Sequence, residues 1–374
     1  MSEPRGLYIH IPFCAGGKCP YCDFYSVAYS AQAGRRYVGA VKEALAFWGR
    51  RAAGLPFDTV YFGGGTPPLL GEGLAELLEA VRGAFRLSEG AEVTLEANPA
   101  SALAPLLPLL RGAGFNRISM GLQSAQEGEL ALLGRKHTTQ DAAQAVEAAR
   151  AAGFENISLD LMLATPGQIP SSLRHSVEFA AMPGVKHISA YMLKIEPGTP
   201  FGKAKELPGL PGEEAQRALY LLACEELARR GFIQYEISNF AFPGYESRHN
   251  LIYWHDGEYL GIGPAAHSFF GGRRFHYPRS LEAFLSGAGP EQDGEGGDFE
   301  EYCMLRLRLC EGLEQAQMKQ RFGRGFEALD GALIERCAAA GLLVCSDGRL
   351  CLTREGFLVS NAVIGGLLYG GGHG

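Results

Sequence analysis

Short apolar runs alternate with longer amphipathic stretches from residue 7 to about residue 195. The apolar runs predict strands over residues 7–11, 59–62, 92–96, 117–121, 157–162 and 187–193. The stretches between them carry apolar residues at helical spacing, and they predict helices over residues 36–53, 74–85, 103–112, 139–152 and 172–181. Alternation of this kind is typical of a parallel α/β sheet or barrel.

A glycine followed by a phenylalanine recurs between a predicted helix and a predicted strand, at Gly114-Phe115, Gly153-Phe154 and Gly231-Phe232. A glycine just past a helix end can take the left-handed conformation, and the following residue can pack back on the helix. The separations of 39 and 78 residues indicate a repeating βα unit with one copy skipped. A predicted helix over residues 213–230 completes a sixth unit, which favours a barrel, although periodicity alone also allows a doubly wound sheet.

The pattern becomes irregular after residue 232. Residues 234–240 predict one more strand, and residues 286–297 are rich in glycine and acidic residues, which is typical of a flexible linker. Beyond it, helices are predicted over residues 301–309, 313–322 and 328–340, followed by a hairpin over residues 342–352. We therefore expect a main domain over residues 1–285, a linker over 286–297 and a small winged-helix-like α+β domain over 298–374.

Composition limits the function. The chain has 374 residues, 47% of them apolar, so it can bury a large core. A formal net charge of −7 gives no general electrostatic footprint for nucleic acid, and the predicted wing carries few basic residues. No signal peptide and no apolar run of about 18 residues is visible. We expect a cytoplasmic protein that does not bind nucleic acid.

Nine cysteines in such a compartment favour metal binding over disulfides. Cys345 and Cys351 flank an Asp347-Gly348 turn, which pairs Cys345 with Leu350 and points the two thiols to opposite faces of the hairpin. We expect no bond between them.

Three other cysteines, Cys14, Cys19 and Cys22, fall within nine residues directly after the first predicted strand. A structural zinc site and an ordinary [4Fe-4S] cluster each need four ligands, but Phe24 stands two positions after Cys22 and the next cysteine is Cys224. A cubane held by these three thiolates would leave one iron open. A zinc knuckle completed by His10 and a chance cluster of buried cysteines are the alternatives.

These cysteines resemble the signature of the radical S-adenosylmethionine (SAM) family, C-x3-C-x2-C with an aromatic residue, here Tyr21, before the last cysteine. The first gap departs from the family pattern, because Ala15-Gly16-Gly17-Lys18 makes it four residues long. Two glycines can absorb the extra residue, since they accept positive φ without steric cost. The resemblance implies a partial (β/α)6 barrel with a [4Fe-4S] cluster and SAM.

Polar residues lie near the carboxyl ends of the predicted strands, where functional groups gather in parallel barrels. Taken singly, the glycine run at residues 63–65 could be a plain turn. Glu96, Gln123, Arg135 and Asp160 could likewise be solvated residues at strand ends. Matched to the coproporphyrinogen-oxidase-like branch of the family, they imply a SAM site. In that resemblance Glu96 and Asp160 meet hydroxyl or amino groups and Arg135 faces the carboxylate, and the remaining contacts are Tyr8, Tyr21, Gly64, Gly65, Thr66, Gln123 and Ala266. The segment Gly261-Ile-Gly263 opens no βαβ unit, so it does not indicate a dinucleotide site.

The segment His249-Asn250-Leu-Ile-Tyr253-Trp254 resembles a hallmark of the HemW family of haem chaperones, although a lone histidine is more often a structural residue. The related HemN oxidases resemble C-x3-C-x2-C-x-C and have a long segment before it, whereas this chain has Phe24 and thirteen residues before Cys14. The resemblance implies that these four residues bind haem and that haem passes to apo-haemoproteins, such as those of a respiratory chain.

Two alternatives stay open. One is a radical SAM enzyme that decarboxylates the propionates of coproporphyrinogen III, and the other is a structural metalloprotein with a vestigial SAM site. The sequence also leaves open whether SAM is cleaved, whether the protein is a monomer or a dimer, and whether it contacts the inner face of a membrane.

Overall fold

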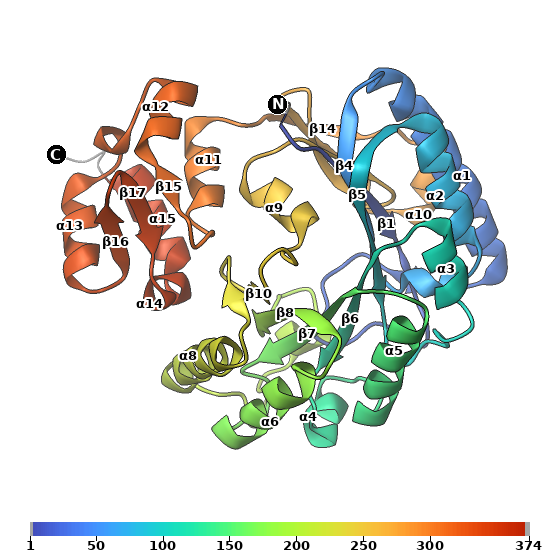
Figure 1. The fold of residues 1–374 in the computed structure, drawn as a ribbon, viewed down its shortest axis with the longest axis horizontal. Coiled ribbons are helices and arrows are strands. Elements are labelled where there is room, and N and C mark those ends of the chain that lie inside the picture. Colours follow the sequence, from blue (N-terminus) through green and yellow to red (C-terminus); the bar gives the residue numbers. More distant parts are fainter. Residues whose placement is uncertain (1–2, 371–374) are drawn as a thin grey trace.

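A computed structural model describes residues 3–370 of the chain. Six parallel strands form the curved centre of a 12-stranded sheet (Figure 1), in the spatial order in which the chain forms them. They are β1 (Gly6–Ile11), β4 (Pro56–Gly64), β5 (Arg86–Ala97), β6 (Arg117–Gln123), β7 (Asn156–Leu163) and β8 (Val185–Met192). The prediction of a parallel α/β architecture is confirmed.

Helices cover the outer side of this sheet (Figure 1). They are α1 (Ala31–Arg51), α2 (Gly73–Ala84), α3 (Leu107–Ala113), α4 (Glu127–Leu132), α5 (Thr139–Ala151), α6 (Pro170–Ala180) and α8 (Glu213–Arg229), with the short α7 (Pro200–Lys203) and the 3-10 helix η1 (Pro67–Leu70) between strands. Apolar side chains such as Leu7, Ile9 and Phe62 are fully buried and join one core with the apolar faces of these helices. No helix among the described residues is long and apolar enough to span a membrane.

The inner side of the sheet is polar, because apolar and polar residues alternate along the central strands. Residues paired across parallel strands point to the same side of the sheet. One such row consists of Tyr8, Tyr61, Thr94 and Arg117. A second row consists of Glu96, Ser119, Ser158 and His187. The concave side therefore presents hydroxyl, carboxyl, imidazole and guanidinium groups.

The three glycine–phenylalanine pairs end helices as predicted. Each glycine has a positive φ, and each following N–H donates to the carbonyl five residues earlier, at 3.0–3.1 Å. The phenylalanines are buried. Each copy of the repeat is therefore a Schellman-type motif that ends a helix before the next strand.

Both edges of the sheet extend beyond the predicted strands. Beside β1 lie β11 (Tyr259–Ile262, parallel) and then β12 (His267–Phe270), β13 (Arg273–His276) and β14 (Glu291–Glu295), with α10 (Leu281–Leu285) inserted. Beside β8, the strand predicted over residues 234–240 is instead a tight pair, β9 (Ile233–Gln234) and β10 (Asn239–Ala241).

The prediction of a flexible linker over residues 286–297 is wrong for its second half. Residues Glu291–Glu295 form β14, which pairs antiparallel with β13. The glycine-rich and acidic composition predicted a linker, but a strand can be added to a sheet edge through backbone hydrogen bonds alone. Such an added strand needs no apolar side chains. All five residues of β14 are exposed.

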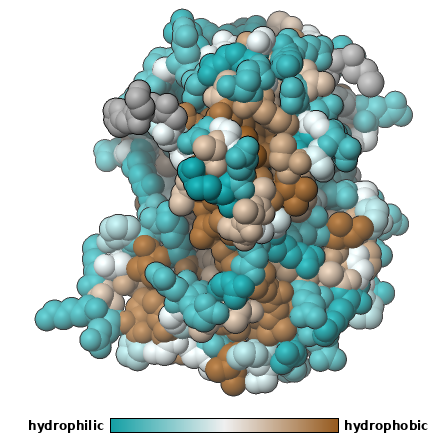
Figure 2. All heavy atoms as spheres, turned by 90° about the vertical axis from the view of Figure 1, so that its left-hand side faces the viewer, coloured by the Kyte–Doolittle hydropathy of each residue, from teal (hydrophilic) through white to brown (hydrophobic). Residues whose placement is uncertain are grey.

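The C-terminal part is a small α+β unit. It contains α11 (Phe299–Arg306), β15 (Leu313–Glu314), α12 (Gln315–Phe322), the 3-10 helix η2 (Phe326–Ala328), α13 (Gly331–Ala339), β16 (Leu343–Ser346), β17 (Arg349–Leu352), α14 (Arg354–Leu358) and α15 (Ser360–Tyr369). The predicted hairpin register is confirmed, since Cys345 pairs with Leu350 and Val344 with Cys351. Both cysteines are free thiols. Figure 2, which faces this unit, shows hydrophobic residues exposed among hydrophilic ones.

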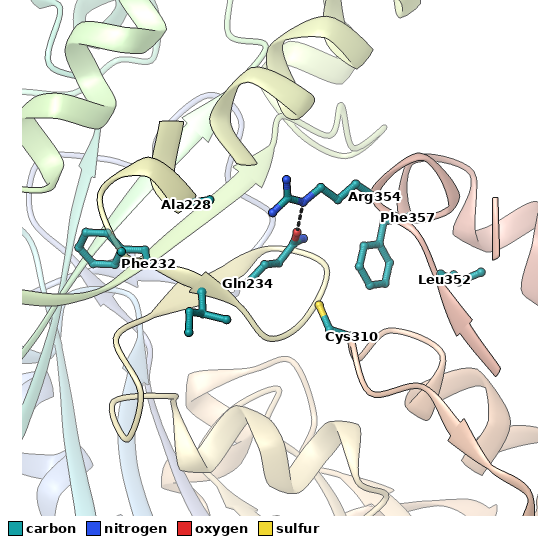
Figure 3. Close-up of a pocket in the computed structure, with 9 residues that line it drawn as sticks. Ala228, Phe232, Gln234, Cys310, Leu352, Arg354 and Phe357 are labelled. Carbon is teal, nitrogen blue, oxygen red and sulfur yellow. Dashed lines mark hydrogen bonds between the residues drawn. The ribbon is translucent and has the colours of Figure 1, made fainter. Parts of the chain in front are cut away.

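Polar contacts join the small unit to the barrel. Arg354 donates to the Gln234 side chain at 3.3 Å, and both residues line a small cavity of about 290 Å³. Figure 3 draws this contact as a dashed line. Arg217 of α8 donates to Glu355 at 2.9 Å, and the Cys310 N–H donates to the Tyr235 carbonyl at 3.0 Å. These contacts fix the small unit beside β9 and α8.

Candidate functional site

The three cysteines lie in a loop that a short parallel ladder closes. Strand β2 (Phe13–Cys14) pairs with β3 (Val27–Ala28), and the Cys22 N–H donates to the Cys19 carbonyl at 3.1 Å. Gly16 and Gly17 both have positive φ, so the two glycines do take the conformations that an extra residue requires. Lys136 donates to the Gly16 carbonyl at 3.0 Å and holds the widened part of the loop from outside.

The donor set fits an iron–sulfur cluster better than a single zinc ion. All three thiols are free and partly exposed. His10 is not available as a fourth ligand, because its two ring nitrogens already pair with the Tyr8 hydroxyl and the Tyr25 carbonyl, both at 2.9 Å. Among residues 3–370, no three cysteine, histidine or carboxylate ligand atoms that include these thiols lie within 4.8 Å of one another. A cubane binds each thiolate to a separate iron, so it does not require the three sulfurs to converge on one ion.

The glycine run at the end of β4 lies directly against the stem of the cysteine loop. The N–H of Gly65 donates to the Ile11 carbonyl at 2.9 Å, and a Cβ on Gly65 would stand 2.3 Å from the carbonyl oxygen of Phe13. A Cβ on Gly64 would stand 2.6 Å from the His10 ring, and the Thr66 N–H donates to the Phe13 carbonyl at 2.7 Å. Close backbone approach to the cysteine segment is therefore one physical reason for these glycines.

Glu96 lies on the polar inner side of the sheet, beside the glycine run. Its carboxylate accepts hydrogen bonds from the Tyr61 hydroxyl at 2.7 Å and from the Gly64 N–H at 2.9 Å. Burial raises the pKa of Glu96 to about 7. Asp160 accepts from the Ser119 hydroxyl at 3.1 Å, and burial raises the pKa of Asp160 as well.

Arg135 joins the cysteine loop to the strands. Its guanidinium donates to the Gly121 carbonyl at 2.8 Å, to Asn98 at 3.2 Å and to the Cys19 sulfur at 3.7 Å. Its Nε is buried without a hydrogen-bond partner among the described residues. A half-buried, partly unsatisfied guanidinium beside the thiols suits an anionic group of a ligand.

The other predicted SAM residues border the same end of the barrel. Gln123, the last residue of β6, has a φ of 68°, which turns the chain away from the sheet. Tyr21 packs on a small apolar cluster that contains Leu133 and Met162. Ala266 is buried in the turn that follows β11, the strand that pairs with β1.

The predicted haem motif occupies helix α9 (Arg248–Trp254), which lies against the polar inner side of the sheet (Figure 1). His249 is buried, and its ring nitrogens pair with the Thr59 and Tyr253 hydroxyls, both at 2.6 Å. Its ring stacks on Tyr61 at 4.9 Å between centroids. Burial lowers the pKa of His249 to about 3, so the imidazole is neutral. Asn250 and Trp254 are half-buried on the same helix.

Sequence reasoning missed several residues of this site, among them Thr59, Tyr61, Glu92, Arg117 and Lys136. Glu92 accepts hydrogen bonds from the N–H groups of Arg248 and His249, at 3.3 and 3.2 Å, and so stabilises the start of α9. A signal was present, because polar residues occupy every second position of these strands. Alternation along several successive strands predicts a polar barrel interior.

Comparisons with known proteins agree with this geometry. The profile of the radical SAM superfamily matches residues 8–180, and the profile of the HemN C-terminal domain matches residues 299–359. In structure, the chain is similar to the coproporphyrinogen III oxidase HemN of Escherichia coli, described as a radical SAM enzyme, with a TM-score of 0.83 over 97% of this chain and 89% of that one. The sequence identity is 20%, so this likeness concerns the fold.

Similarity in sequence extends over nearly whole chains. The haem chaperone HemW of Mycobacterium tuberculosis is 38% identical over 381 residues, which cover 98% of this chain and 95% of that protein. The haem chaperone HemW of Escherichia coli is 36% identical over 371 residues, which cover 96% and 97%.

Proposed function

Since the chain belongs to the radical SAM superfamily and, within it, to the HemW family of haem chaperones, we propose that it binds haem and hands it to apo-haemoproteins. The observation that supports this proposal is the sequence similarity to HemW proteins, which extends over nearly the full length of this chain and of those proteins. We propose apo-proteins of a respiratory chain as acceptors.

We propose that Cys14, Cys19 and Cys22 hold a [4Fe-4S] cluster. The free thiols, their spacing and the engaged nitrogens of His10 support it. When bound, the cluster supplies an iron with an open position to which the amino and carboxylate groups of SAM can attach.

The SAM contacts follow from the polar end of the barrel. We propose that Arg135 pairs with the carboxylate of SAM, since its Nε lacks a partner, and that Glu96 and Asp160 accept hydrogen bonds from amino or hydroxyl groups. Glu96 also fixes the Gly64 backbone, so it positions the glycine run against the ligand. The further contacts that we propose are Tyr8, Tyr21, Gly64, Gly65, Thr66, Gln123 and Ala266.

A reconstitution under anaerobic conditions tests the proposal. Reconstituted protein should contain iron and sulfide, and its reduced EPR spectrum should change when SAM is added. Titration with hemin should give a Soret band that saturates at a fixed stoichiometry, and the haem should then appear in an added apo-haemoprotein. Decarboxylation of coproporphyrinogen III in the presence of SAM and reductant, without haem binding, would refute the chaperone function in favour of the oxidase.

A further inference from the structure

A cavity of about 790 Å³ lies between α9, the start of β4 and the small unit. Its wall combines α9, the segment before β1, and helices α11 and α12 of the small unit. One side of α9 faces the sheet, with His249 and Tyr253. The other side lines the cavity, with Arg248, Leu251 and, directly after the helix, His255. A cavity of this size is in the range that holds a cofactor-sized molecule.

Part of the lining is apolar and can contact a flat ring. Leu251 and Ile252 supply aliphatic surface from α9, and Tyr302 supplies an aromatic ring from α11. Ile252 and Tyr302 are nearly fully buried, so their positions are fixed by packing. Ligand pockets combine apolar surface with polar groups that orient the ligand, and this cavity has both.

Three guanidinium groups line the same cavity, against two carboxylates, Glu3 and Asp58. Arg306 has a side chain only 7% exposed, and its Nε is buried without a hydrogen-bond partner among the described residues. Arg321 pairs with Asp256 at 2.6 Å, and Arg248 is exposed and donates to the Gly90 carbonyl at 2.8 Å. Each guanidinium has five N–H donors, so further donors are available to an anionic ligand.

His255 ends α9 at this cavity. Its side chain is 41% exposed, and its Nε2 pairs with Glu311 at 2.7 Å, while Arg306 pairs with the same carboxylate oxygen at 3.0 Å. A carboxylate on one ring nitrogen is the usual partner of an imidazole that binds a metal with the other. By contrast, both ring nitrogens of His249 are already engaged within the protein.

We propose that haem is held in this cavity, with its propionates on Arg248, Arg306 and Arg321, its ring against Leu251 and Tyr302, and its iron on His255. The inference rests on the proposed chaperone function and adds the place and polarity of the cargo. It also places α9 between the cargo and the polar inner side of the sheet.

Hemin titrations of variants test the site. Arg248→Gln should weaken hemin binding about tenfold, because a charge-assisted hydrogen bond is lost. The matched change Arg324→Gln, on an exposed arginine outside the cavity, should alter the affinity less than twofold. For the unaltered protein, hemin dimethyl ester, which lacks the carboxylates, should bind at least tenfold more weakly than hemin.

Two further variants separate this site from others. Gln320→Trp fills the cavity from an exposed position of α12 and should weaken binding at least tenfold, whereas Gln144→Trp, on the exposed side of α5, should not. His255→Ala should change the Soret and visible bands of the complex. Circular dichroism and melting temperatures will show whether each variant is folded.

The outcomes distinguish the inference from the function on which it rests. If the unaltered protein binds hemin and these cavity variants bind it equally well with unchanged spectra, the cavity is refuted and the chaperone function stands. A spectrum that depends on His249 and ignores His255 refutes the iron ligand. If the unaltered protein binds no hemin, both proposals fall.

Discussion

Replacement of Glu96 by glutamine should remove a pH dependence of stability that the buried carboxylate causes. Its pKa is about 7 in the folded protein, against an ordinary value of 4.5. The pKa of Glu96 is higher in the folded protein than in the unfolded chain. Ionisation of Glu96 therefore does not lower the free energy of unfolding below about pH 4.5, and it lowers this free energy increasingly as the pH rises to about 7. Between pH 5 and pH 8, the unaltered protein should lose about 2.5 kcal/mol of unfolding free energy from this group alone.

Urea unfolding of the cofactor-free protein, followed by circular dichroism from pH 5 to pH 8, measures this effect. The stability of Glu96→Gln relative to the unaltered protein should rise by about 2.5 kcal/mol over the range, since the amide does not titrate. The prediction concerns this slope, because the glutamine changes the bonds to Tyr61 and Gly64 at every pH. Glu79→Gln, on an exposed part of α2, serves as the control. Parallel curves for Glu96→Gln and the unaltered protein would show that the carboxylate is solvated.

Three more predictions concern the cysteine loop and the core. Alanine at Cys14, Cys19 or Cys22 should abolish the incorporation of iron and sulfide. The control Cys337→Ala, at a buried cysteine of α13, should retain it. Equal iron content in these four variants would refute the assignment of the three cluster ligands. Gly65→Ala should lower the free energy of unfolding by about 1–3 kcal/mol and reduce iron content, because the added Cβ meets the Phe13 carbonyl. The control Gly83→Ala, at an open position of α2, should raise the free energy of unfolding by roughly 0.5–1 kcal/mol. A Gly65→Ala protein with unchanged stability and iron content would contradict the tight packing. Phe115→Ala should cost about 3–5 kcal/mol in urea unfolding, and a loss below 1 kcal/mol would show that this residue is not part of a rigid core.

Much of the fold could be predicted because each central strand contains a run rich in apolar residues and regular helices separate these runs. The Gly114-Phe115 type of stop marks the unit boundaries, since helix termination is a local event. The added strands β11 to β14 could not be found in this way. Their side chains are mixed, and what holds them is backbone pairing with segments far away in the chain.

The composition of the candidate site was predictable where its residues lie at the carboxyl end of a strand, as Glu96 and Gln123 do. Its neighbours Tyr61 and Arg117 were missed, because they lie inside strands and were taken as part of the sheet rather than as polar lining. The orientation of His249 also could not be predicted. Seven-residue helices such as α9 have no strong amphipathic period, so only the folded structure shows which side faces the sheet.

Strand β14 shows how the outermost position of a large sheet can be kept safe. An unpaired strand edge is a template on which a second chain can assemble, and such contacts lead to aggregation. In β14 the sequence Glu-Gln-Asp-Gly-Glu places three carboxylates along this edge, and an identical edge on another molecule would meet them with the same charge. The residues that resemble a linker in the sequence thus protect one of the two edges of the twelve-stranded sheet.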